Sequence, residues 1–546
     1  MRVGPIFATL AVMAVVLAPN QAVALSNTRV TDDATAGSYS RFDGTQDATT
    51  MGCSTSRRPQ NEPAIAVDPH NVQVVTAGAN DYCPQATLPN HEVWAGYYRS
   101  TDGGTTFKDS LVPGYTADTT AAGSASPVHG TCNAAGDPTQ SFDRDGRLFY
   151  SFICFNRTGP VNGGFFVATY DQDGAHYVRT VEVAKGTPSG HFSAGLFQDK
   201  PNLVADQTTG RFSGNVYVAW SRDSGVSNNN VILFSRSTDH GAIFSAPIKV
   251  TNGIVGNELF TDMAVAPDGT LYLTFRTTNF QGPTFDGIWL TRSTDGGVSF
   301  TEPRLLARIT AFESNQFSGN GSADCGDGPF ACPTGLTFSR FSSLSAVAAD
   351  SAGVHIVWSA ELSSGQAKVF VANSADGVHF GTPTTLDANP RGHQYYPDVA
   401  SADGVITAVF YDSRNDLAYS PNLPPGDTSA GTNSGGAVDT FVARSSDGGK
   451  SWNETRVTTV SSNYNWETHG SRRLPFWGDY IYVSAVPGAV NVAWTDSRNL
   501  VPGTDPRDPN ATDGFDVFQP CPTTATIDNP CLNKGGLDQN IYSTRI

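Results

Sequence analysis

Carboxylates and arginines recur at matching places along the chain, next to short apolar segments that we predict to be β-strands. Facing carboxylates can supply the acid and the base of a hydrolysis reaction, and guanidinium groups bind a carboxylate in bidentate fashion. The acids lie where first strands of repeated units are predicted to begin: Glu62, Asp137, Asp199, Asp262, Asp398 and Asp479. The ends of the second strands carry Asp81, Arg157, Arg222, Arg276, Arg414 and Arg498.

The tetrapeptide D-S-R-N occurs at residues 412–415 and again at residues 496–499. Repetition at equivalent places predicts an ion pair that belongs to the scaffold, and exposed pairs of this kind add little stability. The functional alternative is that these arginines bind the carboxylate of a ligand.

A nine-residue phrase predicts the elements that position these side chains. It reads RSTDGGTTF at 99–107, RSTDHGAIF at 236–244, RSTDGGVSF at 292–300 and RSSDGGKSW at 444–452. Each copy follows an alternating apolar run and precedes a second short strand, which predicts a hairpin turn. The Asp side chain can accept backbone N–H groups, Gly provides positive φ, and the closing ring can pack between strands. This is the Asp-box motif, for which we predict a structural role.

Degenerate copies extend the repeat to seven units, each with about four predicted strands. Such a pattern predicts an all-β protein, a β-propeller of four-stranded blades with seven blades; a six-bladed ring with an accessory piece is the alternative. Residues 28–31 (TRVT) match 455–458 in an outer strand, so the N-terminal strand is predicted to close the ring. The acids and arginines then converge at one mouth, opposite the Asp-box turns.

The N-terminus, residues 1–24, has the pattern of a signal peptide, with one Arg, an apolar run and a small-x-small site that ends at Ala24. We therefore predict a secreted protein whose single domain spans 25–546, with loop insertions at 108–136, 415–438 and 499–538. Eight cysteines suggest disulfides between sequence neighbours. The predicted pairs are Cys53–Cys83, Cys132–Cys154, Cys325–Cys332 and Cys521–Cys531.

The acidic composition, with a net charge of -17, argues against nucleic acid or an anionic membrane as partner. No segment after the N-terminus is apolar enough for a membrane helix, and we expect a monomer that binds carbohydrate. No metal site or cofactor is predicted, because there is no C-x-x-C motif and no calcium-binding loop. A structural Ca²⁺, held by the ring of acids or by residues 505–516, is the open alternative.

Asp boxes in a secreted propeller resemble the sialidase (neuraminidase) superfamily, whose members hydrolyse sialic-acid glycosides. NELFTDMAVAPDGTLYLTFR (257–276) resembles the family segment that holds a Glu and an Arg, which implies Glu258 as base and Arg276 as carboxylate ligand. YYPDVASADGVITAVFYD (395–412) implies Tyr396 as nucleophile, with Tyr395 as the alternative. The tyrosine nucleophile is the family's exception to the two-carboxylate scheme.

The remaining roles follow from the same resemblance. Asp81 in GANDY implies the acid/base, and SRRP implies Arg58, or Arg57, as a further ligand for the carboxylate. Where the family has a third arginine, this chain offers Lys368. Three hypotheses remain open: an exo-sialidase, a non-catalytic propeller that binds glycan or protein, and a hydrolase of neutral polysaccharide, which needs two carboxylates across the mouth.

Overall fold

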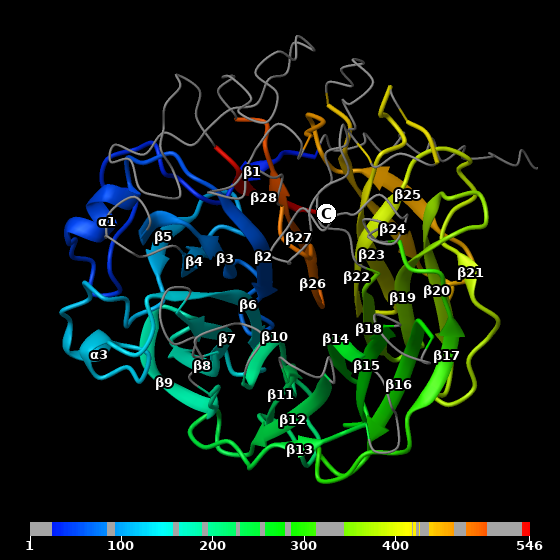
Figure 1. The fold of residues 1–546 in the computed structure, drawn as a ribbon, viewed down its shortest axis with the longest axis horizontal. Helices are drawn as coiled ribbons and strands as arrows, with labels where there is room; N and C mark the ends of the chain where they lie inside the picture. The colour runs from blue at the N-terminus through cyan, green and yellow to red at the C-terminus, as the bar shows by residue number, and fades with distance from the viewer. Residues whose placement is uncertain are drawn as a thin grey trace, which may run out of the picture.

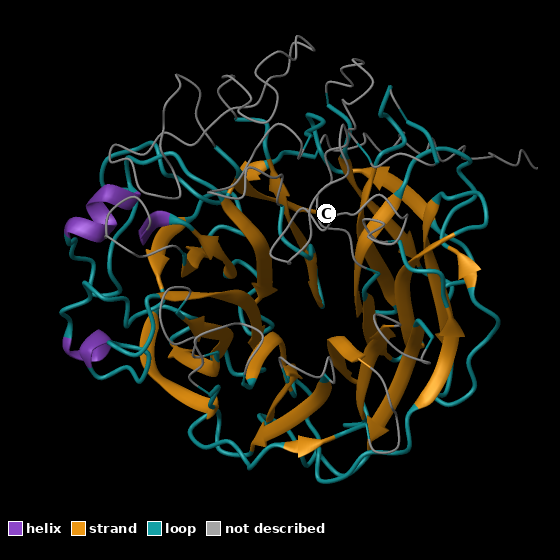
Figure 2. Cartoon of the chain, in the orientation of Figure 1, coloured by secondary structure: helices purple, strands orange, loops and turns teal. Residues whose placement is uncertain are grey.

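The strands of the molecule form seven antiparallel sheets around a central axis, as Figure 1 shows. The computed structural model describes residues 25–84, 93–156, 163–187, 195–224, 230–251, 257–278, 285–312, 343–417, 419–421, 425, 436–463, 477–499 and 538–546. Two short helices, α1 (Ala48–Cys53) and α3 (Ala121–Ser124), lie at the outer edge (Figure 2). No helix of these residues is long and apolar enough to span a membrane.

Each sheet is one blade of four strands, and each of blades 1 to 6 is formed by four strands that follow one another in the chain. Blade 1 is β2 (Gln60–Val67), β3 (Val75–Asp81), β4 (Trp94–Ser100) and β5 (Lys108–Leu111). Blade 2 is β6 (Ala134–Phe142), β7 (Leu148–Phe155), β8 (Gly164–Asp171) and β9 (His176–Ala184). Blade 3 is β10 (Phe197–Ala205), β11 (Val216–Asp223), β12 (Val231–Ser237) and β13 (Ile248–Lys249).

The second half of the ring follows the same plan. Blade 4 is β14 (Asn257–Val265), β15 (Leu271–Thr278), β16 (Gly287–Ser293) and β17 (Arg304–Arg308). Blade 5 is β18 (Ser345–Asp350), β19 (Gly353–Glu361), β20 (Ala367–Ser374) and β21 (Thr384–Thr385). Blade 6 is β22 (Gln394–Ala402), β23 (Val405–Asp412), β24 (Asp439–Ser445) and β25 (Asn453–Arg456). Blade 7 is β26 (Tyr482–Val486), β27 (Ala489–Asp496), β28 (Asn540–Arg545) and β1 (Thr28–Arg29).

Blade 7 closes the ring with strands from both ends of the chain. Its order is β1-β28-β27-β26, and Thr28 pairs with Ser543 while Arg29 pairs with Tyr542. The predictions of seven blades and of closure by the N-terminal strand are therefore confirmed, and the six-bladed alternative is wrong. Closure pairs the edge of blade 7 that would otherwise be open.

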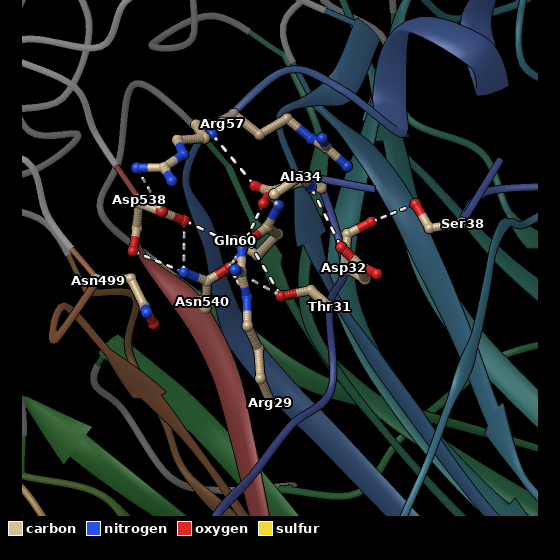
Figure 3. A network of polar contacts seen from close by, with 12 residues as sticks. Arg29, Thr31, Asp32, Ala34, Ser38, Arg57, Gln60, Asn499, Asp538 and Asn540 are labelled. Carbon is tan, nitrogen blue, oxygen red and sulfur yellow. Dashed lines mark hydrogen bonds and ion pairs between the residues drawn. The ribbon is translucent and has the colours of Figure 1, made fainter. Parts of the chain in front are cut away.

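Polar side chains hold this closing seam where blades 7 and 1 meet (Figure 3). Arg29 of β1 donates to Asn540 at 2.6 Å and to Asp538 at 3.0 Å, and it also pairs with Asp33. Thr31 donates to Gln60, the first residue of β2, at 3.2 Å. One arginine thus joins the two ends of the chain at the start of blade 1.

We expect Arg29→Met to lower the free energy of unfolding by about 1–3 kcal/mol, because buried acceptors lose a charged donor. Urea denaturation of the purified chain would measure this change. Arg304→Met, an exposed arginine of blade 4, is the matched control and should change stability by less than about 0.5 kcal/mol. Equal effects of the two substitutions would show that the seam does not depend on Arg29.

The four repeated turns share one hydrogen-bond pattern at the ends of β4, β12, β16 and β24. In the first copy, Ser100 donates to Asp102 at 2.7 Å, and the Asp102 carboxylate accepts the N–H groups of Thr105 and Thr106 at 3.0 and 2.9 Å. Although burial opposes the shift, hydrogen bonds from Ser100 and Thr106 lower the pKa of Asp102 to about 2. The equivalent aspartates make the same backbone contacts at Asp239, Asp295 and Asp447.

Two disulfides tie the outer connections of blades 1 and 2. Cys53–Cys83 joins α1 to the segment after β3, and Cys132–Cys154 joins the segment before β6 to β7. These two predicted pairs are confirmed; the pairs Cys325–Cys332 and Cys521–Cys531 lie outside the described residues.

Of the predicted insertions, residues 108–136 contain β5 and α3, whereas 415–438 and 499–538 lie mostly outside the described part.

Large buried rings fill the blades. Trp220, Trp358 and Trp494 lie near the ends of the second strands of blades 3, 5 and 7, and all three are almost fully buried. The apolar clusters run between neighbouring blades, so each blade is stabilised by the next. This rigid ring holds the first strands around the axis, where the candidate site lies.

Candidate functional site

The innermost strands of five blades carry the same irregularity near their starts. Their register with the second strand shifts, and one residue other than glycine takes a positive φ. A residue with such a φ costs about 1–3 kcal/mol and persists only where the surrounding structure imposes it. The five residues are Glu62 (φ 52), Asp137 (φ 55), Lys200 (φ 49), Phe260 (φ 54) and Tyr396 (φ 50).

Four charged residues from four blades meet near the axis, and we call them the central cluster: Glu62, Asp137, Lys200 and Asp479. The ammonium of Lys200 lies 3.1 Å from a carboxylate oxygen of Asp137 and 3.8 Å from one of Glu62, and it also pairs with Asp479. The cluster therefore joins blades 7, 1, 2 and 3 at the face on which the first strands begin, which we call the mouth face.

Two neighbours fix the position of Glu62. Asn80, at the end of β3, donates to the Glu62 carboxylate at 2.8 Å and accepts the N–H of Asp137 at 2.8 Å. Gly478 packs against Glu62 so closely that a Cβ there would lie 2.2 Å from the Glu62 Cγ. Only glycine fits at 478, and its φ of 85° is one that glycine adopts without strain.

Burial, and then repulsion from Asp137, raises the pKa of Glu62 well above its usual value, although Lys200 opposes the shift. Burial disfavours the charged form of Lys200, but Asp137, Asp479 and Glu62 outweigh it and raise the pKa of the ammonium. The cluster thus holds a carboxylic acid that keeps its proton above the usual range, beside other carboxyl groups. A carboxylic acid with a raised pKa can donate a proton at a pH where an ordinary carboxyl group is ionised.

Aromatic and apolar groups complete the surroundings of the cluster. A small cavity of about 60 Å³ is lined by Lys200, Phe260, Pro397 and Tyr480, among others. The Lys200 ammonium lies 5.8 Å from the centre of the Tyr480 ring. Lys200 is the member of the central cluster that lines this cavity, and the carboxyl groups at its wall belong to Asp262 and Asp398.

A larger cavity of about 570 Å³ follows the axis towards the face of the repeated turns. Figure 1 shows the innermost strands β2, β6, β10, β14, β18, β22 and β26 around this axis. Two predicted acids line it, and each accepts a backbone N–H from another blade: Val347 donates to Asp262 and Val483 to Asp398, both at 2.7 Å. Burial raises the pKa of Asp262 to about 6. These two acids tie blades together.

The predicted residues Arg58 and Asp81 lie together outside the central cluster. Arg58 donates to both carboxylate oxygens of Asp81, at 2.6 and 3.1 Å, and both side chains are buried. Tyr39 and Tyr98 also donate to Asp81, at 2.8 and 2.9 Å. This arrangement supports the packing of blade 1, and the acid/base and substrate-binding roles of the pair stay predictions.

The other predicted cations are also paired within the scaffold. Arg276 donates to Asp286 at 2.9 Å and to the carbonyl of Ser343 at 3.2 Å. Lys368 lies 2.5 Å from Asp387 in an ion pair of the outer part of blade 5. Neither residue is part of the central cluster, so their predicted role with a substrate carboxylate stays untested.

Glu258 and Tyr396 lie in different parts of the ring. Glu258 accepts the N–H of Ile232 at 2.9 Å and the hydroxyl of Thr251, at the junction of blades 3 and 4, and burial raises its pKa. Tyr396 belongs to blade 6, with its ring 5.5 Å from Tyr395 and at a near-perpendicular angle to it. The predicted pairing of the two as base and nucleophile stays a prediction.

The repeated D-S-R-N segments form ion pairs, as predicted for the scaffold. Arg414 lies 2.6 Å from Asp412, and Arg498 lies 2.7 Å from Asp496.

Lys200 was not among the residues predicted from the sequence, although N-E-P, G-D-P and D-K-P recur at the starts of β2, β6 and β10. That recurrence of a charged residue before proline is a signal for three members of the cluster, Glu62, Asp137 and Lys200.

The fold and the site define a seven-bladed β-propeller with a charged cluster at its axis. No protein-family model matches the chain, and no curated protein matches it. Solved structures with a similar architecture include an α-L-arabinanase of Penicillium chrysogenum, at 14% identity and TM-score 0.40 over 66% of this chain and 91% of that one. An α-L-arabinofuranosidase mutant of Fusarium graminearum has 13% identity and TM-score 0.43 over 71% and 94%. The intramolecular trans-sialidase of Ruminococcus gnavus has 14% identity and TM-score 0.40 over 67% and 92%.

Proposed function

We propose that the protein is a secreted, carbohydrate-active propeller that hydrolyses uncharged glycosides at the central cluster. The observation that carries this proposal is the pair of Glu62 and Asp137, which lie on positive-φ bulges of neighbouring blades at the mouth face and share Lys200 as a partner. Burial raises the pKa of Glu62 above its usual value. Glycoside hydrolysis uses one carboxylic acid to protonate the leaving oxygen and a second carboxylate to activate water or attack the sugar. The two disulfides agree with an oxidising, extracellular environment.

The roles follow from the contacts of each group. Glu62 is the general acid, because burial and repulsion from Asp137 raise its pKa. Asp137 is the second carboxylate, because its side chain is more exposed than that of Glu62. Lys200 is a positioning residue that holds both carboxyl groups, and the Tyr480 ring below it provides an apolar surface for the sugar.

Charge favours an uncharged sugar over sialic acid. The central cluster contains three carboxyl groups and one cation, Lys200. A sugar carboxylate would meet further negative charge there, and the arginines that could offset it are bound to Asp81 and Asp286. Because a bidentate guanidinium already engaged with an aspartate has to be released before it can bind substrate, these residues favour a neutral substrate.

A sialidase-like exo-glycosidase is the second candidate function, with Tyr396 as nucleophile. The observation that favours it is the position of Tyr396. In blade 6 it has the positive φ at the strand bulge that Glu62 and Asp137 have in blades 1 and 2. In that case Glu258 and Asp81 would be the base and the acid/base, and Arg58, Arg276 and Lys368 would bind the carboxylate. A non-catalytic propeller that binds glycan at the same mouth is the third outcome that an assay has to separate.

An assay of the purified chain on fluorogenic neutral glycosides and on a fluorogenic sialoside tests the proposal. We expect turnover of a neutral glycoside that falls at least about 100-fold in Asp137→Asn and stays near the parent value in Tyr396→Phe. Circular dichroism would verify that both variants are folded.

The opposite result would be turnover of the sialoside that is abolished in Tyr396→Phe and in Glu258→Gln. It would contradict the proposal and support the sialidase mechanism. Retention on immobilised glycan without any turnover would contradict catalysis and leave a binding protein. Retention should then be lost in Asp137→Asn if the central cluster is the binding site.

A further inference from the structure

Three potential metal ligands lie together at the junction of blades 1 and 2, on the face of the repeated turns. Asp68 and His70 follow β2, and Asp173 lies in the turn between β8 and β9. Within the described part of the chain, one ligand atom from each lies within 4.8 Å of the other two. The Nδ1 of His70 lies 3.4 Å from a carboxylate oxygen of Asp173.

Asp68 is the buried member of this group. Its side chain is fully buried, and one oxygen accepts the N–H of His70 at 2.8 Å. The other oxygen, Oδ2, is buried without a hydrogen-bond partner among the described residues. A buried carboxylate oxygen without a partner is costly.

A glycine lets the two carboxylates approach each other. Gly146, in the turn between β6 and β7, has a φ of 79°. A Cβ at this position would lie 2.4 Å from the Oδ1 of Asp173 and 3.2 Å from the Oδ2 of Asp68. Asp173 is itself held in a positive-φ conformation, and Arg99 of blade 1 donates to its carbonyl at 2.8 Å. Elements of both blades therefore fix the space between the ligands.

The next junction of the ring has a cation in the equivalent space. Asp143 of blade 2 occupies the equivalent turn, and the guanidinium of Arg147 lies 3.4 Å from its carboxylate. His240 of blade 3 lies 3.5 Å from the same carboxylate. Four residues after Asp68 the chain has Val72 instead of an arginine. Among the described residues, position 72 therefore does not supply at blades 1 and 2 the cation that Arg147 supplies at blades 2 and 3.

We propose that Asp68, His70 and Asp173 bind a divalent transition-metal ion that joins blades 1 and 2. One imidazole with two carboxylates suits Zn²⁺, whose ligands lie about 2.0–2.2 Å from the metal. Two ligands of a tetrahedral Zn²⁺ are then about 3.4 Å apart, which is the separation of His70 and Asp173. Water completes the shell, because His70 and Asp173 are partly exposed.

Titration of the chelator-treated, tag-free protein with ZnCl₂ tests this site by calorimetry and by thermal unfolding. We expect a binding event that Asp68→Asn and Asp173→Asn weaken at least about tenfold, and a Tm that rises with Zn²⁺ in the parent but not in these variants. The matched control is His240→Ala, at the junction that already has Arg147, and it should bind Zn²⁺ like the parent.

Loss of folding in Asp68→Asn would leave His70→Ala as the informative variant, because 61% of the His70 side chain is exposed. Binding that is unchanged in His70→Ala and Asp173→Asn would place the metal elsewhere and overturn the proposal. The absence of any Zn²⁺-dependent heat or Tm shift in the parent would overturn it as well.

Discussion

Replacement of Glu62 by glutamine is expected to lower kcat for a neutral glycoside by about 10²- to 10⁴-fold, the range that a lost general acid produces. The amide has the same shape, and its oxygen can still accept from Asn80, which donates to Glu62 at 2.8 Å. It cannot supply a proton to a leaving group. Steady-state kinetics measures the loss, and Glu361→Gln, on β19 of blade 5 and outside the central cluster, is the matched control.

The pH dependence of the same variant provides a second readout. Burial and Asp137 raise the pKa of Glu62 above the ordinary value of 4.5, so the acid form persists to higher pH and activity should fall as pH rises through this raised pKa. The residual activity of Glu62→Gln should lack this alkaline limb.

Stability should change in the same direction. The folded state binds the Glu62 proton more tightly than the unfolded state, so this contribution is fully present below the unfolded pKa and is lost as pH rises through the folded pKa. The slope of unfolding free energy against pH should therefore be smaller in Glu62→Gln than in the parent above pH 4.5. A parent-like kcat and an unchanged alkaline limb in this variant would refute the assigned role.

The fold could be predicted because its signals are local and repeated. Alternating strands and a nine-residue turn phrase specify hairpins, and the number of hairpins specifies the number of blades. The match between TRVT at 28–31 and at 455–458 indicated an outer strand, and β1 (Thr28–Arg29) pairs in that position. These inferences need only the residues within each strand and turn.

The candidate site could be predicted only in part. Glu62, Asp137 and Asp479 meet near the axis, as the strand starts indicated, but the cation among them is Lys200 and not an arginine. Strand alternation places Asp199 and Lys200 on opposite faces. A residue before proline is normally extended, so the positive φ of Lys200 follows from tertiary packing and not from local sequence.

The arginines show a second limit of sequence reasoning. An arginine near the mouth face has the same sequence signature whether it binds a ligand or an aspartate of its own blade. Arg58 and Arg276 are paired with Asp81 and Asp286, and these partners lie 23 and 10 residues away in the chain. Such pairing depends on geometry across strands, which an isolated sequence does not specify.

Arg58→Met should therefore lower the free energy of unfolding by about 3–5 kcal/mol, because it leaves the buried carboxylate of Asp81 without its cation. The exposed fractions of the two side chains are 3% and 0%, so water cannot compensate. Urea denaturation at pH 7 measures the change. Arg304→Met is the control, since Arg304 is exposed on blade 4, and its loss should cost less than about 0.5 kcal/mol.

The double variant Arg58→Met/Asp81→Leu separates a structural pair from a substrate-binding pair. Removal of both charges leaves no unpaired buried charge, so the double variant should be more stable than Arg58→Met alone. Part of the loss should remain, because the hydroxyls of Tyr39 and Tyr98 lose their acceptor. If Arg58 instead binds a substrate carboxylate, the single variant should stay within about 1 kcal/mol of the parent while sialoside turnover disappears. Stability and turnover of the same variant thus decide between a scaffold pair and a catalytic site that contains Arg58.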